Sequence, residues 1–171
     1  MNIPFRVGLG YDVHQLVTGR PLWLGGILLE HSHGLEGHSD ADVLLHAMCD
    51  ALLGAAGLPD IGHYFPNTDE RWRNADSKLL LSESYRRVRQ AGWLLGNLDA
   101  SLVAEAPKIS PHIPAMKSAI AAALSQVAIE YHDLIVTTDQ VGIKATTNEG
   151  MGFTGRREGI AAYAVALIVR I

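Results

Sequence analysis

Asp12, His14 and His46 are side chains of the types that bind zinc in proteins. Asp12 and His14 are two positions apart near the end of a predicted strand, residues 5–12, and because strand side chains alternate, both point to the same side. His46 lies within a predicted helix. Three protein ligands and one open position are typical of a catalytic zinc site, whereas structural zinc sites are closed and rich in cysteine. The residues alone leave a second interpretation open, a capped strand end beside a surface histidine.

A short polar segment, residues 37–40 (GHSD), precedes the predicted start of the same helix. Free backbone amides and the helix dipole favour an anion at a helix N-terminus, and His38 and Ser39 could each donate a hydrogen bond to a phosphate. Ser39 followed by Asp42 three positions later is also a capping-box pattern. The segment therefore predicts a phosphate contact, a helix cap, or both.

Residues 145–149 (ATTNE) form a second candidate phosphate segment, after a predicted strand. The hydroxyls of Thr146 and Thr147 could contact phosphate oxygens, and the Glu149 carboxylate could hold a Mg²⁺ ion that bridges them. A β-turn with threonines at the strand end is the alternative. Residues 152–159 (GFTGRREG) add two arginines that could clamp phosphate, although glycine-rich turns are commonly only turns.

Other chemistries find little support in the sequence. It contains no Walker A motif, no dinucleotide fingerprint and no nucleophile elbow. Cys49 lies within a predicted helix with no obvious activating charge, so covalent catalysis is not expected. His31 and His33 share the spacing of Asp12 and His14, but glycine and serine surround them, and we interpret them as loop histidines.

The bulk composition fits one globular domain, residues 1–171, with 48% hydrophobic and 19% charged residues. A formal net charge of −4 disfavours nucleic acid as a partner, so an anionic substrate must be held by local groups. The single cysteine fits a reducing compartment. We find no signal-peptide pattern and no apolar run of the roughly 20 residues that span a bilayer, so we expect a cytoplasmic protein with no membrane partner.

Periodicity and turn residues predict a mixed order of strands and helices. The predicted strands are residues 5–12, a hairpin at 22–30 that turns at Gly25 and Gly26, residues 93–104, 141–146 and 160–171. The predicted helices run from Ser39 to about Leu53, over 76–91, and from the prolines at 107–114 to about Ala128. Residues 31–39 are predicted as a loop and 126–140 as a surface excursion. This order predicts an α+β fold, a mixed β-sheet with helices packed on one face and βαβ-type crossovers.

The last predicted strand, residues 160–171, is almost wholly apolar. Such a run is typical of a strand buried on both faces. Its alternate positions Ala162, Ala164 and Ala166 are small, so this face could accept a closely packed helix or another subunit.

Nine motifs stand in order along the chain. They are G-Y-D-V-H at 10–14, G-H-S-D-A-D-V-L-L-H at 37–46, D-A-L-L-G-A-A-G at 50–57, D-I-G at 60–62, F-P-N-T-D at 65–69, A-P-K at 106–108, P-H-I-P at 111–114, K-A-T-T at 144–147 and G-F-T-G-R at 152–156. The series resembles the 2-C-methyl-D-erythritol 2,4-cyclodiphosphate synthase family along almost the whole chain. The resemblance implies a homotrimer of α+β subunits with three active sites between neighbours. It also implies that 4-diphosphocytidyl-2-C-methyl-D-erythritol 2-phosphate is cyclised with release of CMP, a step of non-mevalonate isoprenoid synthesis.

The resemblance further implies a role for each matching residue. Asp12, His14 and His46 match the zinc ligands, and Glu149 matches the ligand of Mg²⁺ or Mn²⁺ between the α- and β-phosphates. His38 and Thr147 match the positions that stabilise the transition state. The substrate contacts implied by the resemblance are Asp12, Val13, His14, His38, Ser39, Asp60, Ile61, Gly62, Phe65, Pro66, Asn67, Thr68, Asp69, Ala104, Glu105, Ala106, Pro107, Lys108, Ile109, Ser110, Thr146, Thr147, Asn148, Glu149, Phe153 and Arg156. Among them, Asp60 and Gly62 match the ribose contacts, residues 104–110 the cytosine segment and 65–69 a mobile loop.

Three positions depart from the family pattern: Asn67 replaces an Asp, Asn148 a hydroxyl residue and Arg157 a glycine. The last change puts an apolar cavity on the trimer axis in doubt. Two other functions fit the same residues. One is a mononuclear zinc phosphohydrolase, in which the metal activates water. The other is a non-catalytic trimer that binds an isoprenoid diphosphate.

Overall fold

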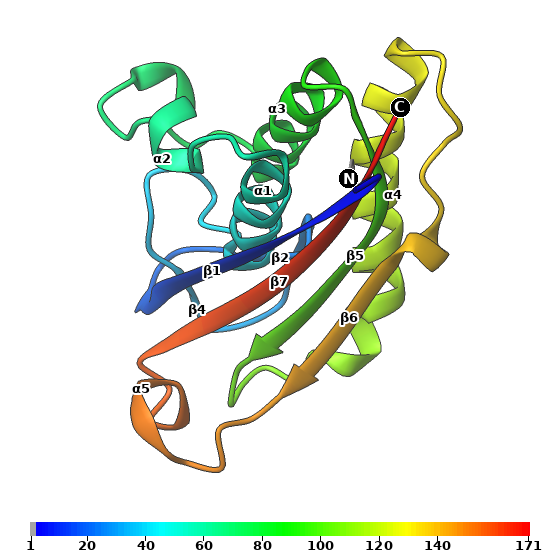
Figure 1. Cartoon of the computed structure of the whole chain (residues 1–171). Coiled ribbons are helices and arrows are strands. Elements are labelled where there is room, and N and C mark those ends of the chain that lie inside the picture. Colours follow the sequence, from blue (N-terminus) through cyan, green and yellow to red (C-terminus); the bar gives the residue numbers. More distant parts are fainter. Residues whose placement is uncertain (1–2) are drawn as a thin grey trace.

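A five-stranded mixed sheet forms the centre of the protein, in the strand order β4-β1-β7-β5-β6 (Figure 1). The structure is a computed structural model that describes residues 3–171. The strands of this sheet are β1 (Phe5–Thr18), β4 (His33–Leu35), β5 (Trp93–Val103), β6 (Val141–Thr146) and β7 (Gly159–Arg170). A separate hairpin pairs β2 (Leu22–Leu24) with β3 (Ile27–Leu29) around the predicted glycine turn.

The helices differ widely in length. They are α1 (Val43–Ala56), α2 (Ile61–Tyr64), α3 (Ser77–Gln90), α4 (Ile113–Glu130) and α5 (Gly152–Gly155), with 3-10 turns at Glu70–Trp72, Ser110–His112 and Thr138–Gln140. Helix α4 joins β5 to β6, which pair in parallel, whereas β1 with β7, β5 with β7 and β1 with β4 pair antiparallel. The predicted α+β class with a mixed sheet is therefore confirmed.

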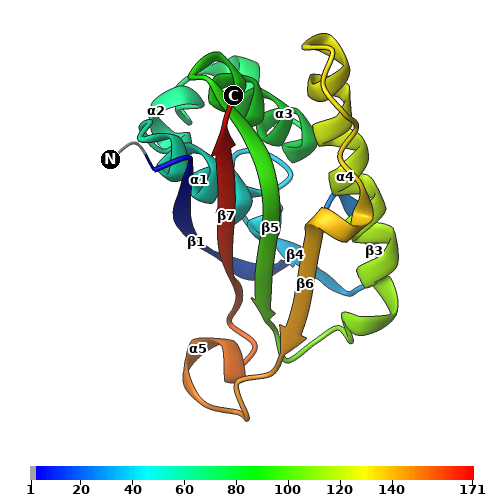
Figure 2. The same ribbon diagram turned by 45° about the vertical axis from the view of Figure 1, so that its right-hand side comes forward.

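The long helices α1, α3 and α4 lie on one face of the sheet, as predicted (Figures 1 and 2). Helix α1 crosses β1 and β7 at close range because small residues line the strands beneath it. A Cβ atom on Gly10 would lie 1.9 Å from the carbonyl oxygen of Ala47, and one on Gly8 would lie 2.1 Å from that of Ala51. Ala162, Ala164 and Ala166 of β7 are buried, and α1 also packs against this strand. Of the two predicted partners for this face, a helix or another subunit, the chain supplies the helix.

The opposite face of the sheet is apolar, and no segment within residues 3–171 covers it. Its exposed side chains include Leu9 at 69%, Val7 at 60%, Tyr163 at 48%, Val13 at 41% and Val165 at 39%. The prediction that the last strand is buried on both faces is therefore wrong for the isolated chain. An apolar run shows that a strand face avoids water, but it does not show whether the chain itself supplies the cover.

The predicted start of the first helix is also wrong. Helix α1 begins at Val43, and Asp42 is its N-cap, with a side chain that accepts a hydrogen bond from the Leu45 amide at 3.1 Å. The same carboxylate accepts from the amides of Gly25 and Gly26 at 3.0 and 2.7 Å, so it ties the β2–β3 turn to the helix. Ser39 instead accepts from the Ala41 amide at 3.1 Å.

Strand β4 was predicted as loop, because three residues are too short to show an alternating pattern. It forms because β1 extends past its predicted end to Thr18 and pairs Leu16 with Leu35. The stretch 126–140 is partly helical, since α4 reaches Glu130, and it returns over the surface with Leu134 94% exposed. Across residues 3–171, no helix has the length and apolar character needed to cross a membrane.

Candidate metal centre and active-site cavity

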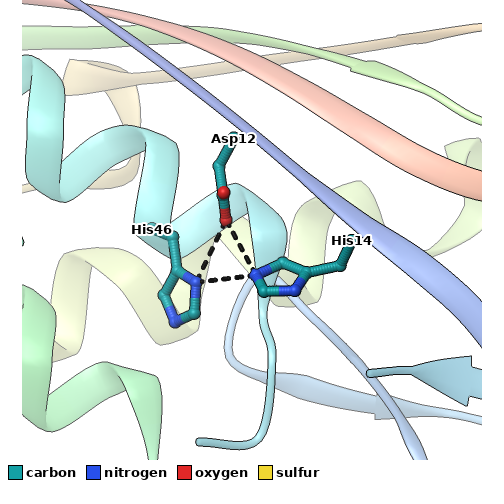
Figure 3. Close-up of side chains that lie close together, drawn as sticks. All are labelled: Asp12, His14 and His46. Carbon is teal, nitrogen blue, oxygen red and sulfur yellow. Dashed lines mark hydrogen bonds and ion pairs between the residues drawn. The ribbon is translucent and has the colours of Figure 1, made fainter. Parts of the chain in front are cut away.

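Asp12, His14 and His46 converge in space, as the family resemblance implied (Figure 3). Asp12 and His14 project from the same side of β1, and His46 projects from the adjacent helix α1. Asp12 Oδ2 lies 3.0 Å from His14 Nε2 and 3.1 Å from His46 Nδ1, and the two imidazole nitrogens are 3.1 Å apart. The three ligand atoms therefore form a nearly equilateral triangle.

This triangle fits a zinc ion. Zinc binds imidazole nitrogen and carboxylate oxygen at about 2.0–2.2 Å, so neighbouring ligand atoms of a tetrahedral site are about 3.3 Å apart. The observed separations of 3.0–3.1 Å are close to that value. One carboxylate and two imidazoles also leave the fourth position of a tetrahedron open, which is the pattern of a catalytic site.

Hydrogen bonds on the far side of each imidazole fix the ring orientations. His14 Nδ1 lies 2.6 Å from the backbone oxygen of Glu36, so it carries the proton and directs a lone pair of Nε2 at the cluster. His46 Nε2 lies 2.9 Å from Ser77 Oγ and 3.2 Å from Ser39 Oγ. Such outer contacts orient metal ligands in known metalloproteins.

The cluster also perturbs its own acid–base equilibria. Burial opposes ionisation of Asp12, but the hydrogen bonds and charge of the His14 and His46 rings, which donate to this carboxylate when they are protonated, outweigh it and hold the pKa of Asp12 at about 2. Burial lowers the pKa of His14, but the hydrogen bond and charge of Asp12 outweigh that effect, and the net shift is upward. The carboxylate between two imidazoles thus forms a site that stabilises a positive charge, whether that charge comes from a proton or from a metal ion.

A cavity of about 430 Å³ opens beside the cluster. It brings together many of the predicted site residues, namely His14, His38, Ser39, His46, Ile61, Gly62, Phe65, Pro66 and Asn67. Trp72 and Leu80 also line it and were missed by the sequence reasoning. A tryptophan within an otherwise polar turn segment was the available signal for Trp72. The imidazole Nε2 of His38 and the indole nitrogen of Trp72 are buried and have no hydrogen-bond partner among the described residues, so a ligand in this cavity could satisfy them.

The other predicted site residues lie elsewhere in the chain. A second cavity of about 220 Å³ is lined by Ala104, Glu105, Pro107, Lys108, Ile109, Ser110, Ala145, Thr146 and Thr147. It lies at the ends of β5 and β6, and strand β7 separates β5 from β1, which carries Asp12 and His14. The structure therefore does not bring Thr147 together with the zinc-type ligands within one chain.

Most of the remaining candidates lie in or beside turns and short helices, and Val13 lies in β1. Asp60 caps α2 by accepting from the His63 amide at 2.9 Å, and Asp69 pairs with Arg71 next to Thr68. The Glu105 carboxylate accepts from the amides of Asn148 and Gly150 at 2.8 and 3.2 Å, which fixes the 148–150 turn that contains Glu149. Arg156 follows Phe153 at α5 and pairs with Glu158 at 2.7 Å. Ala106 lies in the loop after β5, and Val13 turns its side chain to the outer face of the sheet.

The sequence matches the YgbB family over residues 5–169. The chain is 60% identical, over 170 residues and 99% of both chains, to 2-C-methyl-D-erythritol 2,4-cyclodiphosphate synthase of Bordetella avium. It also resembles the solved structure of the bifunctional IspDF from Campylobacter jejuni, with a TM-score of 0.88 and 40% identity over 98% of this chain and 42% of that chain. A solved 2C-methyl-D-erythritol-2,4-cyclodiphosphate synthase in its CDP-bound form has a TM-score of 0.81 and 36% identity over 95% of this chain and 99% of that chain. The chain therefore belongs to the YgbB family, together with the relatives named as cyclodiphosphate synthases.

Proposed function

We propose that the protein converts 4-diphosphocytidyl-2-C-methyl-D-erythritol 2-phosphate to 2-C-methyl-D-erythritol 2,4-cyclodiphosphate and CMP, as a phosphorus–oxygen lyase of isoprenoid precursor synthesis. The observation that carries the proposal is the Asp12–His14–His46 cluster, which lies at the edge of a cavity with both polar donors and an apolar wall. Relatives that match 99% of the chain and carry the synthase name support the same activity.

The proposed reaction depends more on positioning the two phosphate groups than on a strong general base. The attacking 2-phosphate already carries anionic oxygens, and the reaction is intramolecular, so a curled bound conformer could remove several kcal/mol of the barrier. In this proposal Ile61, Phe65 and Leu80 hold the methylerythritol carbon chain against the apolar wall. His38 and Ser39 donate to phosphate oxygens at the polar end. Zinc at the cluster and Mg²⁺ or Mn²⁺ at Glu149 would supply charge neutralisation when bound.

The nucleotide half of the substrate needs the second set of residues. The cavity of residues 104–110 with Thr146 and Thr147 offers backbone groups and hydroxyls of the kind that hold a base and a phosphate. We propose that it receives the cytidine, with Thr147 stabilising the transition state. A solved relative that holds CDP supports a cytidine nucleotide as the ligand class.

One chain does not complete this site, and we propose a homotrimer with active sites between subunits. Within the chain, β7 stands between the strand that carries the zinc-type ligands and the strands that frame the nucleotide cavity. The uncovered apolar sheet face, with Leu9 69% exposed and Val165 39% exposed, is a surface that assembly would cover. Sedimentation of the purified protein tests this directly, and a stable monomer would contradict it.

The activity is tested by ³¹P NMR on zinc-loaded protein with the cytidine diphosphate substrate and Mg²⁺. We expect the cyclic diphosphate and CMP from the wild type, and strong loss of both with His46→Ala and with Glu149→Ala. Ser82→Ala is the matched control and should retain activity, because this buried serine of α3 donates to the Ala123 backbone oxygen and not to the cluster. A linear phosphate product would instead favour a zinc phosphohydrolase, and retained ligand binding without turnover would favour a binding trimer.

A further inference from the structure

His46 has contacts on both sides of its ring, and on the side away from the metal cluster these continue through buried Ser77 to the partly buried Asp40. Its Nδ1 faces Asp12 and His14, and its Nε2 faces Ser77 Oγ at 2.9 Å. Ser77 is fully buried at the first turn of α3, and His46 is 7% exposed. Behind Ser77 lies the Asp40 carboxylate, which accepts from the Ser77 hydroxyl and from its backbone amide, the latter at 2.9 Å.

The direction of each hydrogen bond follows from counting protons. A serine hydroxyl has one proton to donate, and a carboxylate has none. The Ser77 proton is committed to Asp40, so Ser77 can only accept from His46. When a metal occupies the cluster, Nδ1 of His46 must present a lone pair, so the ring carries its proton on Nε2 and donates it to Ser77. Nδ1 is the atom on the cluster side, 3.1 Å from Asp12 Oδ2.

Ser39 is the only other side chain recorded at this nitrogen in the described residues, and its geometry is weaker. Its Oγ is 3.2 Å from His46 Nε2 and already accepts from the Ala41 amide at 3.1 Å. Ser39 also lines the cavity, where its own proton remains free to reach a ligand. Ser77 is thus the main hydrogen-bond partner of His46 Nε2, whereas the hydroxyl of Ser39 is available to a ligand in the cavity.

We propose that Ser77 and Asp40 are positioning residues that lock His46 into the Nε2–H tautomer and so aim its Nδ1 lone pair at the metal. This inference rests on the proposed zinc site and adds two residues that the family resemblance does not assign. It also explains why a buried serine at a helix start is held by a carboxylate from a different segment. Asp40 is itself fixed by the Asp42 amide at 3.1 Å, so the whole chain of bonds is anchored to the backbone.

Metal affinity, independent of catalysis, is the first test. Co²⁺ affinity is measured by titration, followed by the visible absorption of the bound ion, and zinc affinity by competition with Co²⁺. The proteins compared are wild type, Ser77→Ala, Ser39→Ala and the control Ser82→Ala. Outer-shell changes of this kind cost about 10–100-fold in metal affinity. We expect that loss, with altered Co²⁺ bands, for Ser77→Ala, a smaller loss for Ser39→Ala and none for Ser82→Ala, whose hydroxyl donates to Ala123 on another helix. Ser77→Thr, which keeps the hydroxyl, should restore the affinity.

A second measurement needs no variant and covers the case in which Ser77→Ala fails to fold. NMR of the zinc-loaded wild type should show an Nε2–H proton on His46 that exchanges slowly with solvent, because it is hydrogen-bonded to Ser77. A rapidly exchanging Nε2–H proton, or wild-type metal affinity in a folded Ser77→Ala, would overturn the inference while leaving the zinc site intact. Absence of metal binding by the wild type would overturn the inference together with the proposed zinc site.

Discussion

Gly10→Ala is the change that most directly tests how the fold assembles the metal cluster. Gly10 lies on β1, two residues before Asp12, and faces α1 at the turn that carries His46. An added Cβ would lie 1.9 Å from the Ala47 carbonyl oxygen and 2.7 Å from the Ala51 nitrogen. Both contacts are with backbone, so no side chain can rotate away to make room.

The size of the effect follows from these distances. The Cβ–oxygen distance must grow from 1.9 Å to the 3.4 Å of ordinary contact, so strand and helix must separate by about 1.5 Å next to His46. Metal sites tolerate ligand displacements of only about 0.2 Å. We expect a loss of stability of about 1–3 kcal/mol from overpacking. Metal affinity should fall by at least about 100-fold, because a displaced ligand costs more than a lost outer contact.

The assay pairs urea denaturation with Co²⁺ titration and uses Gly54→Ala as the matched control. Gly54 lies on the same helix and near the same strand, but its added Cβ would come no closer than 4.0 Å to Leu9 O. Alanine in a helix is more stable than glycine by about 0.5–1 kcal/mol, so the control should gain stability and keep its metal affinity. Wild-type affinity in a destabilised Gly10→Ala would refute the idea that this spacing sets the ligand geometry.

Three further outcomes are expected. Burial raises the pKa of the Cys49 thiol, so a thiol reagent should not label it at mildly alkaline pH until the protein is unfolded, and rapid labelling of native protein would contradict its placement. Protein stripped of zinc by a chelator should have a free energy of unfolding about 2.7 kcal/mol lower than protein with free zinc at 100 times its dissociation constant. Identical urea curves for the two samples would refute zinc binding to the native state. Val165→Asp, on the uncovered sheet face, should yield a folded monomer with low activity in sedimentation and turnover assays. An unchanged trimer would show that this face is not the interface.

Local pattern was sufficient to place two of the three residues of the metal cluster on one side of a strand. Alternation along a strand placed Asp12 and His14 on one side without knowledge of the sheet. The convergence of His46 depends on a non-local fact, the close crossing of α1 over β1. In retrospect Gly8 and Gly10 carry that information, since alternate glycines on a strand indicate the near approach of another backbone.

Long-range contacts explain where local reasoning failed. Ser39 and Asp42 show the spacing of a capping box, and the prediction chose the first of them as the cap. In the structure Asp42 takes that role because its carboxylate also binds the amides of Gly25 and Gly26, some 17 residues earlier in the chain. Sequence spacing cannot show which of two polar residues will be buried against such a turn.

The two largest gaps between sequence and structure have a common physical origin. The outer side chains of β7 look like core from their composition, and Thr147 and Glu149 look like partners of the zinc-type ligands from their motifs. Within one chain, Tyr163 and Val165 stay exposed, and strand β7 keeps Thr147 from the cluster. Both observations are accounted for if a second copy covers the apolar face and brings its own half of the site. The exposed apolar face and the separation of Thr147 from the metal cluster therefore both favour assembly. Loss of assembly should abolish activity even when every zinc ligand is intact.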